Sequence, residues 1–396
     1  MPLIKRRWLR WTLRSVLLVV VLALVGFFAF APGYIENSMN RVEGADLPEV
    51  DEQTRALHDS LQVVDMHSDT LMWDRDLFDR SDRGHVDLPR LEDGNVALQV
   101  FSSVSKSPKG QNYEANSADS DNITLLTIAQ LQPPRTWTSL LQRSLYHAEK
   151  LRDAAERSDG RLVLVRTKDD LEDLMAKREA GEQVTGAMFS VEGLQDIEGD
   201  IDNLDELYDA GMRMAGFAHF FDNDVVGSMH GEEKGGMTDL GREVFDELED
   251  RGVIVDIAHS SHTAIAEMLD RATRPVVASH GGVQATCDVN RNLTDDEIRG
   301  VAATGGVVGI GYWNAAVCDR TPAAVVDAIE HVIEVGGIET AGLGSDYDGA
   351  TTVGWDTSDI AVITQELRDR GHSDADLAAI MGGNTLRVMR EVLPAS

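Results

Sequence analysis

Eight short apolar runs between residues 61 and 346 constrain the fold of this 396-residue chain more than any other feature. Amphipathic stretches, such as 201–211 and 240–252, separate most of these runs. Strands that are apolar on both faces and alternate with helices are typical of a parallel sheet covered by helices. The runs predict strands at 61–67, 96–103, 185–192, 213–220, 252–259, 275–280, 306–313 and 340–346.

Eight such units in one domain of about 340 residues predict an α/β fold, and specifically a (β/α)8 barrel of the TIM type with helical insertions. The long segment 104–184 falls between the second and third predicted strands, and we expect it to be mostly helical. A doubly wound open sheet is the alternative architecture for the same alternation of strands and helices.

The charge of the chain excludes one broad class of function. Its 36 basic and 68 acidic residues give a net charge of -32. A field of that sign repels phosphate, so we expect no nucleic-acid partner. Only 7 of the basic residues are lysines, and a strongly acidic, lysine-poor surface would suit a salty environment.

The amino terminus has the pattern of a membrane anchor. Residues 15–31 are uncharged and almost wholly apolar, and five bases but no acid precede them. The positive-inside rule then predicts a basic cytoplasmic segment at 1–14 and a transmembrane signal-anchor at 15–32. A polar tether at 33–50 would connect this single-pass anchor to a barrel at 51–396 on the extracytoplasmic, periplasmic side of the inner or plasma membrane.

A cleaved signal peptide is the alternative for this segment. Ala29-Phe30-Ala31 resembles a signal-peptidase site, but Pro32 follows it and should hinder cleavage. Arg6-Arg7 is at most a weak twin-arginine signal, because Arg10 falls where apolar residues are expected. Both readings place most of the chain outside the cytoplasm, where two cysteines can form a disulfide.

Ionisable side chains gather at the carboxyl ends of the predicted strands, where the active sites of barrel enzymes lie. Burying so many of them costs several kcal/mol unless they are paired or bind metal. A single histidine in such a place is more often structural, but six strand ends with ligand-type groups are hard to explain in that way. The residues concerned are His67 and Asp69, Glu192, His219, His259, His280 and Asp346.

The spacing of these residues predicts a two-metal site. His67 and Asp69 share one face of an extended chain, and an imidazole with a carboxylate suits Zn²⁺, although Mn or Co are accepted by the same ligands. His259 and His280 come from adjacent strands and can bind a second ion, while Glu192 can bridge the two. Two ions about 3.5–4 Å apart can hold a shared hydroxide. None of the lysines ends a predicted strand, so a carboxylate fits the bridging position better than a carboxylated lysine.

Three further residues have the chemistry for catalysis or substrate binding. Asp346 ends the last strand and can carry a proton from water to a leaving amine, with Asp348 as the competing candidate. His219 can polarise a carbonyl or stabilise an oxyanion. Arg291 can hold a substrate carboxylate, and its alternative role is a surface ion pair. Cys287 and Cys318 can form a disulfide or remain two buried thiols.

These segments together resemble the membrane dipeptidases (renal dipeptidase, peptidase family M19), which belong to the amidohydrolase-like metallo-barrels. The similarity runs in order over residues 61–390 and is specific as an ordered set. The matching segments are DMHSDT, FSVEG, GMRMAGFAH, GVIVDIAHSS, VVASHGG, NRNLTDDEI, GLGSDYDG and MGGNTLRV.

The resemblance implies a metallo-dipeptidase that also accepts a carboxyl-terminal D-residue and, in some relatives, opens β-lactam rings. It implies one zinc ion on His67, Asp69 and Glu192 and a second on Glu192, His259 and His280. It further implies substrate contacts by His219 and Arg291, proton transfer by Asp346, a Cys287–Cys318 disulfide and a homodimer. Alternatives are another binuclear-metal hydrolase of amides or lactones, such as N-acyl-amino acids, and an inactive metal-binding barrel.

The chain departs from the animal relatives in three places. Their carboxyl-terminal lipid anchor would be replaced here by the amino-terminal helix. The segment 220–236 differs in residues and length, and the segment 97–107 lacks the aromatic residues expected beside the pocket. These departures bear on side-chain preference and not on the metal ligands.

Overall fold

Eight parallel strands form a closed barrel in the computed structural model, which describes residues 2–44 and 46–395 and side chains from residue 8 onward. The barrel order is β2-β3-β5-β6-β7-β8-β9-β10, and β10 pairs with β2, so the sheet has no open edge at its seam. The fold prediction is confirmed and the open-sheet alternative is wrong. The strands are β2 (Val63–Ser68), β3 (Val96–Phe101), β5 (Thr185–Glu192), β6 (Met212–Gly216), β7 (Ile254–Asp256), β8 (Val277–Ala278), β9 (Val307–Ile310) and β10 (Ala341–Leu343).

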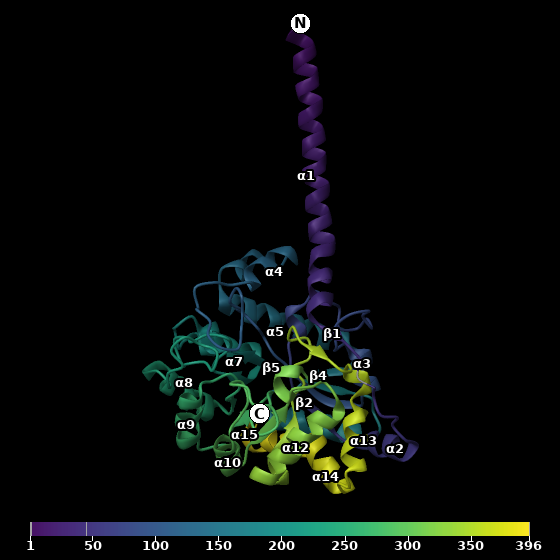
Figure 1. Ribbon diagram of the computed structural model, residues 1–396, viewed down its shortest axis with the longest axis vertical. Helices are drawn as coiled ribbons and strands as arrows, with labels where there is room; N and C mark the ends of the chain where they lie inside the picture. The colour runs from purple at the N-terminus through teal and green to yellow at the C-terminus, as the bar shows by residue number, and fades with distance from the viewer. Residues whose placement is uncertain (1, 45, 396) are drawn as a thin grey trace.

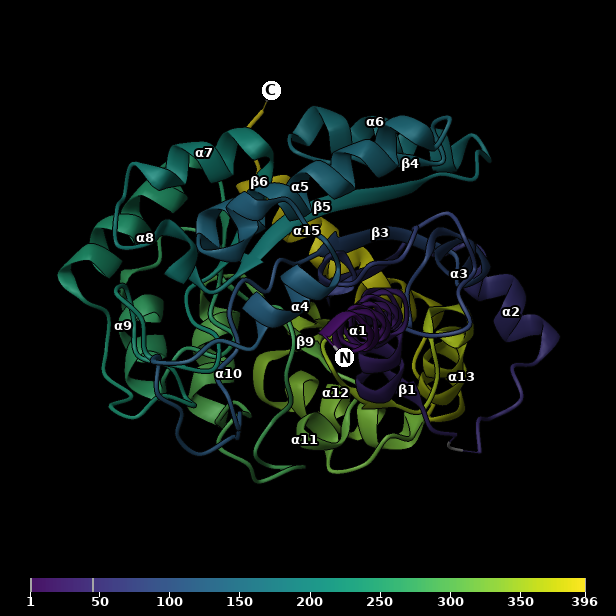
Figure 2. The same cartoon turned by 90° about the horizontal axis from the view of Figure 1, so that it is seen from above.

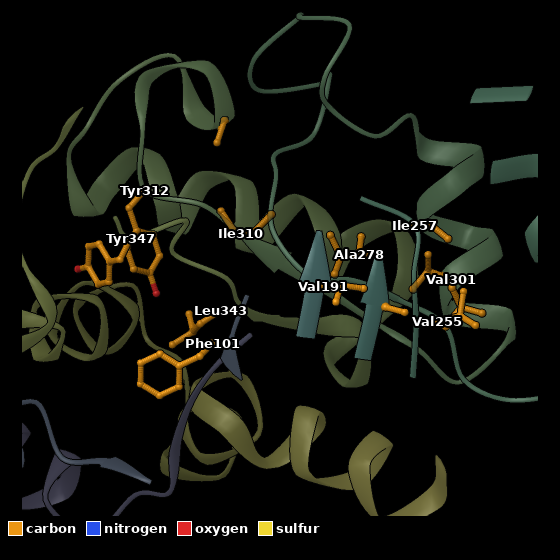
Figure 3. Close-up of a cluster of buried hydrophobic side chains, with 14 of the residues drawn as sticks. Phe101, Val191, Val255, Ile257, Ala278, Val301, Ile310, Tyr312, Leu343 and Tyr347 are labelled. Carbon is orange, nitrogen blue, oxygen red and sulfur yellow. The ribbon is translucent and has the colours of Figure 1, made fainter. Parts of the chain in front are cut away.

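The strands bury both faces, as their continuous apolar runs predict. One cluster of buried side chains collects Met66, Leu98, Met188, Met214 and Val307 from five different strands, which can meet only inside the barrel. A larger cluster joins the outer faces of the strands to the surrounding helices. Figure 3 shows part of this larger cluster, in which strand residues lie beside Val301 of a covering helix.

Helices surround the barrel, and most begin at a Ser, Thr or Asp whose side chain accepts a hydrogen bond from the first helical turn. The bounds are α2 (Glu52–His58), α3 (Leu88–Asp93), α4 (Ile123–Ala129), α5 (Leu140–Arg157), α6 (Lys168–Glu179), α7 (Asn203–Ala210), α8 (Asp239–Arg251), α9 (His262–Arg271), α10 (Asp295–Ala303), α11 (Asn314–Val317), α12 (Pro322–Gly336), α13 (Ala361–Asp369), α14 (Asp374–Ala378) and α15 (Asn384–Val392). Single turns lie at Thr70–Met72, Pro134–Trp137, Leu194–Ile197, Ile338–Thr340, Thr357–Asp359 and Ala379–Gly383.

The insertion between β3 and β5 is mostly helical, as predicted, and contains α4, α5 and α6. It also contains a strand that the sequence pattern did not reveal, β4 (Leu162–Leu164), which pairs with the beginning of β5. Residues 162–165 are apolar like the barrel strands, but they fall inside the segment expected to be mostly helical, and only one of the three strand residues is buried.

A long helix, α1 (Pro2–Met39), rises from the barrel as a straight rod (Figure 1). Its residues Trp8–Met39 are long and apolar enough to cross a membrane, and only 6% of the most apolar stretch is buried. Seen along its axis, α1 stands over the interior of the barrel, close to α4 (Figure 2). The basic side chains before residue 8 lie outside the described residues.

The foot of α1 is bound to the barrel, which differs from the expected tether at 33–50. The helix continues through Pro32 to Met39, and β1 (Arg41–Val42) then pairs in parallel with β11 (Thr352–Val353). The buried carboxylate of Glu36 explains the attachment, because it forms ion pairs with Arg75 and Arg83 of the barrel loops. Residues 33–39 of the expected tether therefore belong to α1, and Arg41–Val42 to β1.

Candidate active site

The predicted metal ligands converge at the carboxyl ends of the barrel strands. His67 lies near the end of β2, with Asp69 just after it, and Glu192 is the last residue of β5. The other histidines follow β6, β7 and β8 after one or two residues of loop. All of these side chains are at least nine-tenths buried: His67, Asp69, Glu192, His219, His259 and His280.

Glu192 lies at the centre of this group. Its Oε1 is 2.9 Å from Nε2 of His259 and 3.2 Å from Nε2 of His280. Its Oε2 is 3.6 Å from Nε2 of His219 and 3.7 Å from Nε2 of His67. One carboxylate therefore touches four imidazoles with its two oxygens, which is the arrangement that a bridging ligand requires.

Asp69 and Asp346 complete the group on the His67 side. Nε2 of His67 lies 3.4 Å from Oδ1 of Asp69 and 4.0 Å from Oδ1 of Asp346. Three overlapping sets of ligand atoms, each within 4.8 Å, occur here: His67 with Glu192 and His280, Glu192 with His219 and His259, and His67 with Asp69 and Asp346. The overlap places all of these groups around one space.

The residues present fit divalent metal ions. Among the described residues, Nε2 of His67, Oδ1 of Asp69 and Oε2 of Glu192 are buried without a hydrogen-bond partner. Buried polar atoms without a partner are costly, whereas a metal ion would satisfy them all. Imidazole nitrogens with carboxylate oxygens are the ligands that zinc and its neighbours prefer.

The electrostatics of Glu192, His259 and His280 favour metal binding, whereas at His67 burial is outweighed by the carboxylates of Glu192 and Asp69, which raise the pKa well above its usual value. Burial opposes the ionisation of Glu192, but the neighbouring His219 and His67 outweigh it and hold the pKa of Glu192 well below its usual value. Burial and the charge of Arg291 lower the pKa of His259 well below its usual value. Burial and the charge of His67 lower the pKa of His280 in the same way. An ionised carboxylate and neutral imidazoles are the protonation states in which these side chains bind metal.

Asp346 and Asp348, the two candidates for proton transfer, have different surroundings. Burial, with Asp69 and Glu192 close by, raises the pKa of Asp346 well above its usual value. Asp348 is instead held in an ion pair with Arg75 and accepts hydrogen bonds from the Thr70 hydroxyl (2.8 Å) and the His85 N–H (2.7 Å). Its oxygens are thus engaged in holding the loop, while those of Asp346 face the metal ligands.

Comparisons with known proteins agree with this geometry. A family model described as "Membrane dipeptidase (Peptidase family M19)" matches residues 51–396. The chain belongs to the membrane dipeptidase family. It is therefore a metal-dependent hydrolase of peptide bonds, and the family and enzyme predictions are confirmed.

Two curated relatives match most of this dipeptidase. Dipeptidase aclJ of Aspergillus oryzae is 27% identical over 361 residues, covering 83% of this chain and 78% of its own. Dipeptidase 3 of Mus musculus is 25% identical over 376 residues, covering 87% of this chain and 67% of its own.

Solved structures share the fold of this dipeptidase. The probable dipeptidase PvdM from Pseudomonas aeruginosa has a TM-score of 0.71 at 21% identity, covering 87% of this chain and 98% of that one. A metallo peptidase from Rhodobacter sphaeroides, liganded with a phosphinate mimic of the dipeptide L-Ala-D-Ala, has a TM-score of 0.69 at 20% identity, covering 84% of this chain and 99% of that one.

Arg291 of this dipeptidase lies inside the site and not in a surface ion pair. Its side chain is 2% exposed, and one Nη2 N–H donates to the carbonyl of His280 (2.8 Å). The predicted disulfide between Cys287 and Cys318 is confirmed and fixes the loop that carries Arg291. The same Nη2 lies 3.4 Å from Nε2 of His259, and Nε has no partner among the described residues.

The sequence interpretation missed the residues that orient the ligands of the dipeptidase. Nδ1 of His280 donates to the Ser279 hydroxyl (2.8 Å), which donates to Asp256 (2.5 Å). Asp65 accepts the backbone N–H groups of His67 (3.1 Å) and Ser345 (3.0 Å). Such partners set the tautomer and direction of metal-binding histidines. A carboxylate within an otherwise apolar strand was the signal that could have revealed both aspartates.

The aromatic lining that seemed to be missing comes from other segments. Trp73, Tyr113, Phe220 and Trp313 line a cavity of about 770 Å³, which Glu192, His219 and Asp346 also line. The indole N–H of Trp313 donates to the Tyr113 hydroxyl (3.2 Å), which joins two loops across the opening. Tyr113 lies in the long insertion, where no periodic pattern indicated that it would reach the site.

Proposed function

We propose that this chain is a membrane-anchored, exported zinc dipeptidase that accepts either an L- or a D-residue at the carboxyl-terminal position. The observation that carries the proposal is the position of Glu192 between four imidazoles, with its own Oε2, Nε2 of His67 and Oδ1 of Asp69 buried and unpartnered among the described residues. A structural metal site needs neither a second set of ligands nor a buried aspartic acid facing it.

Two ions would be held by this chain, one by His67, Asp69 and Glu192 and the other by Glu192, His259 and His280. When bound, zinc activates water and polarises the scissile carbonyl, and Mn or Co can do the same with these ligands. Nδ1 of His219 donates to the Lys106 carbonyl (3.2 Å), which leaves Nε2 directed at the reacting centre. His219 would there stabilise the oxyanion that develops on the substrate.

Arg291 and Asp346 would orient the substrate and move its proton. The guanidinium of Arg291 is buried beside His259 and would bind the terminal carboxylate of a dipeptide through two N–H groups. Asp346 would accept a proton from the attacking water and deliver it to the leaving amine, because its Oδ1 lies beside the metal ligands, 4.0 Å from Nε2 of His67. The phosphinate mimic of L-Ala-D-Ala in a relative of the same fold supports including D-residues.

Hydrolysis of L-Ala-L-Ala and L-Ala-D-Ala by the full chain, with metal analysis, tests the proposal. We expect about two zinc ions per chain and release of free alanine from both substrates. Glu192→Gln should lose metal and activity, whereas the same change at the exposed Glu182, in the turn after α6, should lose neither. A protein replete with zinc but inert on dipeptides would overturn the assignment.

Paired substitutions separate the two candidate proton carriers. Asp346→Asn should lower kcat by about 10²- to 10⁴-fold while zinc content is retained, because only the proton transfer is removed. Asp348→Asn should instead lower the unfolding stability by about 3 kcal/mol through loss of a buried ion pair. Steady-state kinetics, zinc content and denaturant unfolding of both variants distinguish these outcomes, and a larger loss of kcat in folded Asp348→Asn would reverse the assignment.

The topology belongs to the same proposal: residues 1–14 in the cytoplasm, a single span at 15–32 and the barrel on the extracytoplasmic side. Protease added outside sealed cells should digest the barrel and spare the amino terminus. The family resemblance also suggests a homodimer, which light scattering of the detergent-solubilised protein would detect as twice the protomer mass.

A further inference from the structure

The catalytic cavity of this dipeptidase is larger than a dipeptide of small residues requires, and one wall of it comes from the anchor helix. Phe27, Ile35 and Met39 of α1 line the same cavity as Asp69, Glu192 and Arg291. A small dipeptide fills a fraction of the cavity of about 770 Å³, so a large part is left beyond the catalytic groups.

This remaining part of the cavity is apolar. Ile35 packs against a separate cluster of buried side chains between the barrel mouth and the insertion: Met72, Trp73, Val104, Ile123 and Leu126. Leu125 of α4 also lines the cavity although 65% of its surface is exposed. Polar side chains such as Gln111, Asn122 and Arg320 also line the cavity, so its apolar surface is the part formed by α1, α4 and this cluster.

The position of this wall relative to the membrane span is fixed by the structure. The buried ion pairs of Glu36 and the pairing of β1 with β11 hold the foot of α1 against the barrel. Phe27 lies within the apolar stretch 15–31, so the cavity reaches from the catalytic groups to the level of the proposed bilayer. Figures 1 and 2 both show α4 beside α1 at this end of the barrel.

We propose that α1 and α4 form an apolar subsite that binds the hydrocarbon side chain of an amphipathic dipeptide, drawn from the membrane surface. The inference rests on the proposed dipeptidase function and adds the substrate class: dipeptides with a long apolar chain on one residue. The apolar wall binds the chain while Arg291 and the metal ligands hold the polar part.

A series of dipeptides tests this subsite in the full chain reconstituted in lipid nanodiscs. The variable residue is alanine, norleucine or α-aminodecanoic acid, placed at the first position in one series and at the second in another. In at least one series we expect kcat/KM to rise by up to about fourfold for each methylene buried. No gain with chain length in either series would overturn the inference while leaving the dipeptidase assignment intact.

Polar substitutions in α1 and α4 test whether a rise in kcat/KM with chain length comes from this apolar wall. Leu125→Asn and Met39→Asn should reduce the ratio of kcat/KM between the longest and shortest substrates by about fivefold or more. The matched controls Leu131→Asn and Tyr34→Asn change exposed apolar residues that do not line the cavity, and they should leave this ratio unchanged. Equal ratios in all four variants would contradict the inference.

A binding measurement tests the apolar subsite independently of the proposed dipeptidase activity. Reduced-amide analogues of the same dipeptides cannot be hydrolysed, and calorimetry gives their affinity for the metal-loaded protein. If no dipeptide is cleaved, the proposed function fails, but affinity that increases with chain length and is lost in Leu125→Asn still supports the subsite. Affinity that is independent of chain length refutes it.

Discussion

Two residues of the site hold backbone conformations that side chains normally avoid. His259 has φ = 63° and Asp346 has φ = 57°, in the left-handed region. Such residues cost about 1–3 kcal/mol each and persist where their surroundings hold them. Here the Thr351 hydroxyl donates to the carbonyl of Asp346 (2.8 Å), and the Met229 N–H donates to that of His259 (2.8 Å). The strain orients both side chains toward Glu192.

A buried carboxyl next to the site gives the stability of the protein a specific pH dependence. Asp196 accepts hydrogen bonds from the hydroxyls of Ser105 and Ser144, and burial raises its pKa from 3.8 to about 8. The folded state therefore keeps a proton that the unfolded chain releases above about pH 4. The contribution of Asp196 to stability is largest at acid pH and is lost as the pH rises toward 8.

Asp196→Asn should remove this dependence, because asparagine stays neutral. Between about pH 6 and about pH 7.5 the unfolding free energy of the wild type should fall by about 2 kcal/mol relative to that of the variant. Urea unfolding of both proteins across this range measures the difference, in which the contribution of the metal site cancels. A difference that does not change with pH would show that Asp196 is ionised in the folded protein.

Among single residues, the sequence predicted the polar side chains at the ends of strands and missed the residues that orient these side chains or line the cavity around them. His259 and Glu192 were found because a polar group directly follows an apolar run. Asp256 was missed because a single carboxylate within such a run resembles a tolerated exception until its partner Ser279 is seen beside it. Tyr113 was missed because its place depends on how an irregular loop returns to the barrel.

Among the elements, α1 could be predicted as a helix from its local sequence, but its attachment to the barrel could not. The apolar stretch predicted a helix, but nothing in the pattern indicated that Glu36 would be buried against Arg75 and Arg83. The partners lie about 40 residues away in loops without periodic structure, so their convergence depends on the closed barrel. The barrel strands were predictable because each carries its own apolar run. β4 was missed because its short run lies in the insertion between the helices α5 and α6.

Glu36→Gln tests how firmly the foot of α1 is attached. Removing one partner of a buried ion pair leaves the arginines uncompensated, so we expect a loss of about 3 kcal/mol or more in unfolding free energy. Glu43→Gln is the matched control, since this exposed carboxylate pairs with Arg41 and Arg320 at the surface. It should cost at most about 1 kcal/mol. Denaturant unfolding in detergent micelles compares the two, and equal losses would show that the buried network does not stabilise the barrel.

For the whole molecule, charge is the dominant long-range term. A chain with a net charge of -32 repels itself in the compact state, and salt screens this repulsion. Salt also weakens the attraction within surface ion pairs, but these pairs are fewer than the acidic residues in excess of basic ones. Salt should therefore stabilise this protein.

We expect the unfolding midpoint to rise by several degrees between about 0.05 M and about 0.5 M NaCl, a range in which the screening length falls to a few ångströms. Thermal unfolding followed by circular dichroism measures the midpoint. Sucrose at matched osmolality is the control for effects that do not involve charge. A midpoint that is constant or falls in NaCl would mean that the acidic groups are already compensated within the fold.

The attachment of α1 also limits what can approach the enzyme. Only three residues lie between Pro32, at the end of the apolar stretch, and the buried Glu36, and the rise from one to the other is about 6 Å of helix. With α1 in a bilayer, the lipid head groups lie directly above the barrel opening and leave a gap about as thick as a peptide. Folded proteins and bulky polymers are too thick to enter that gap, so the membrane itself would act as a size filter before any substrate reaches the metal site.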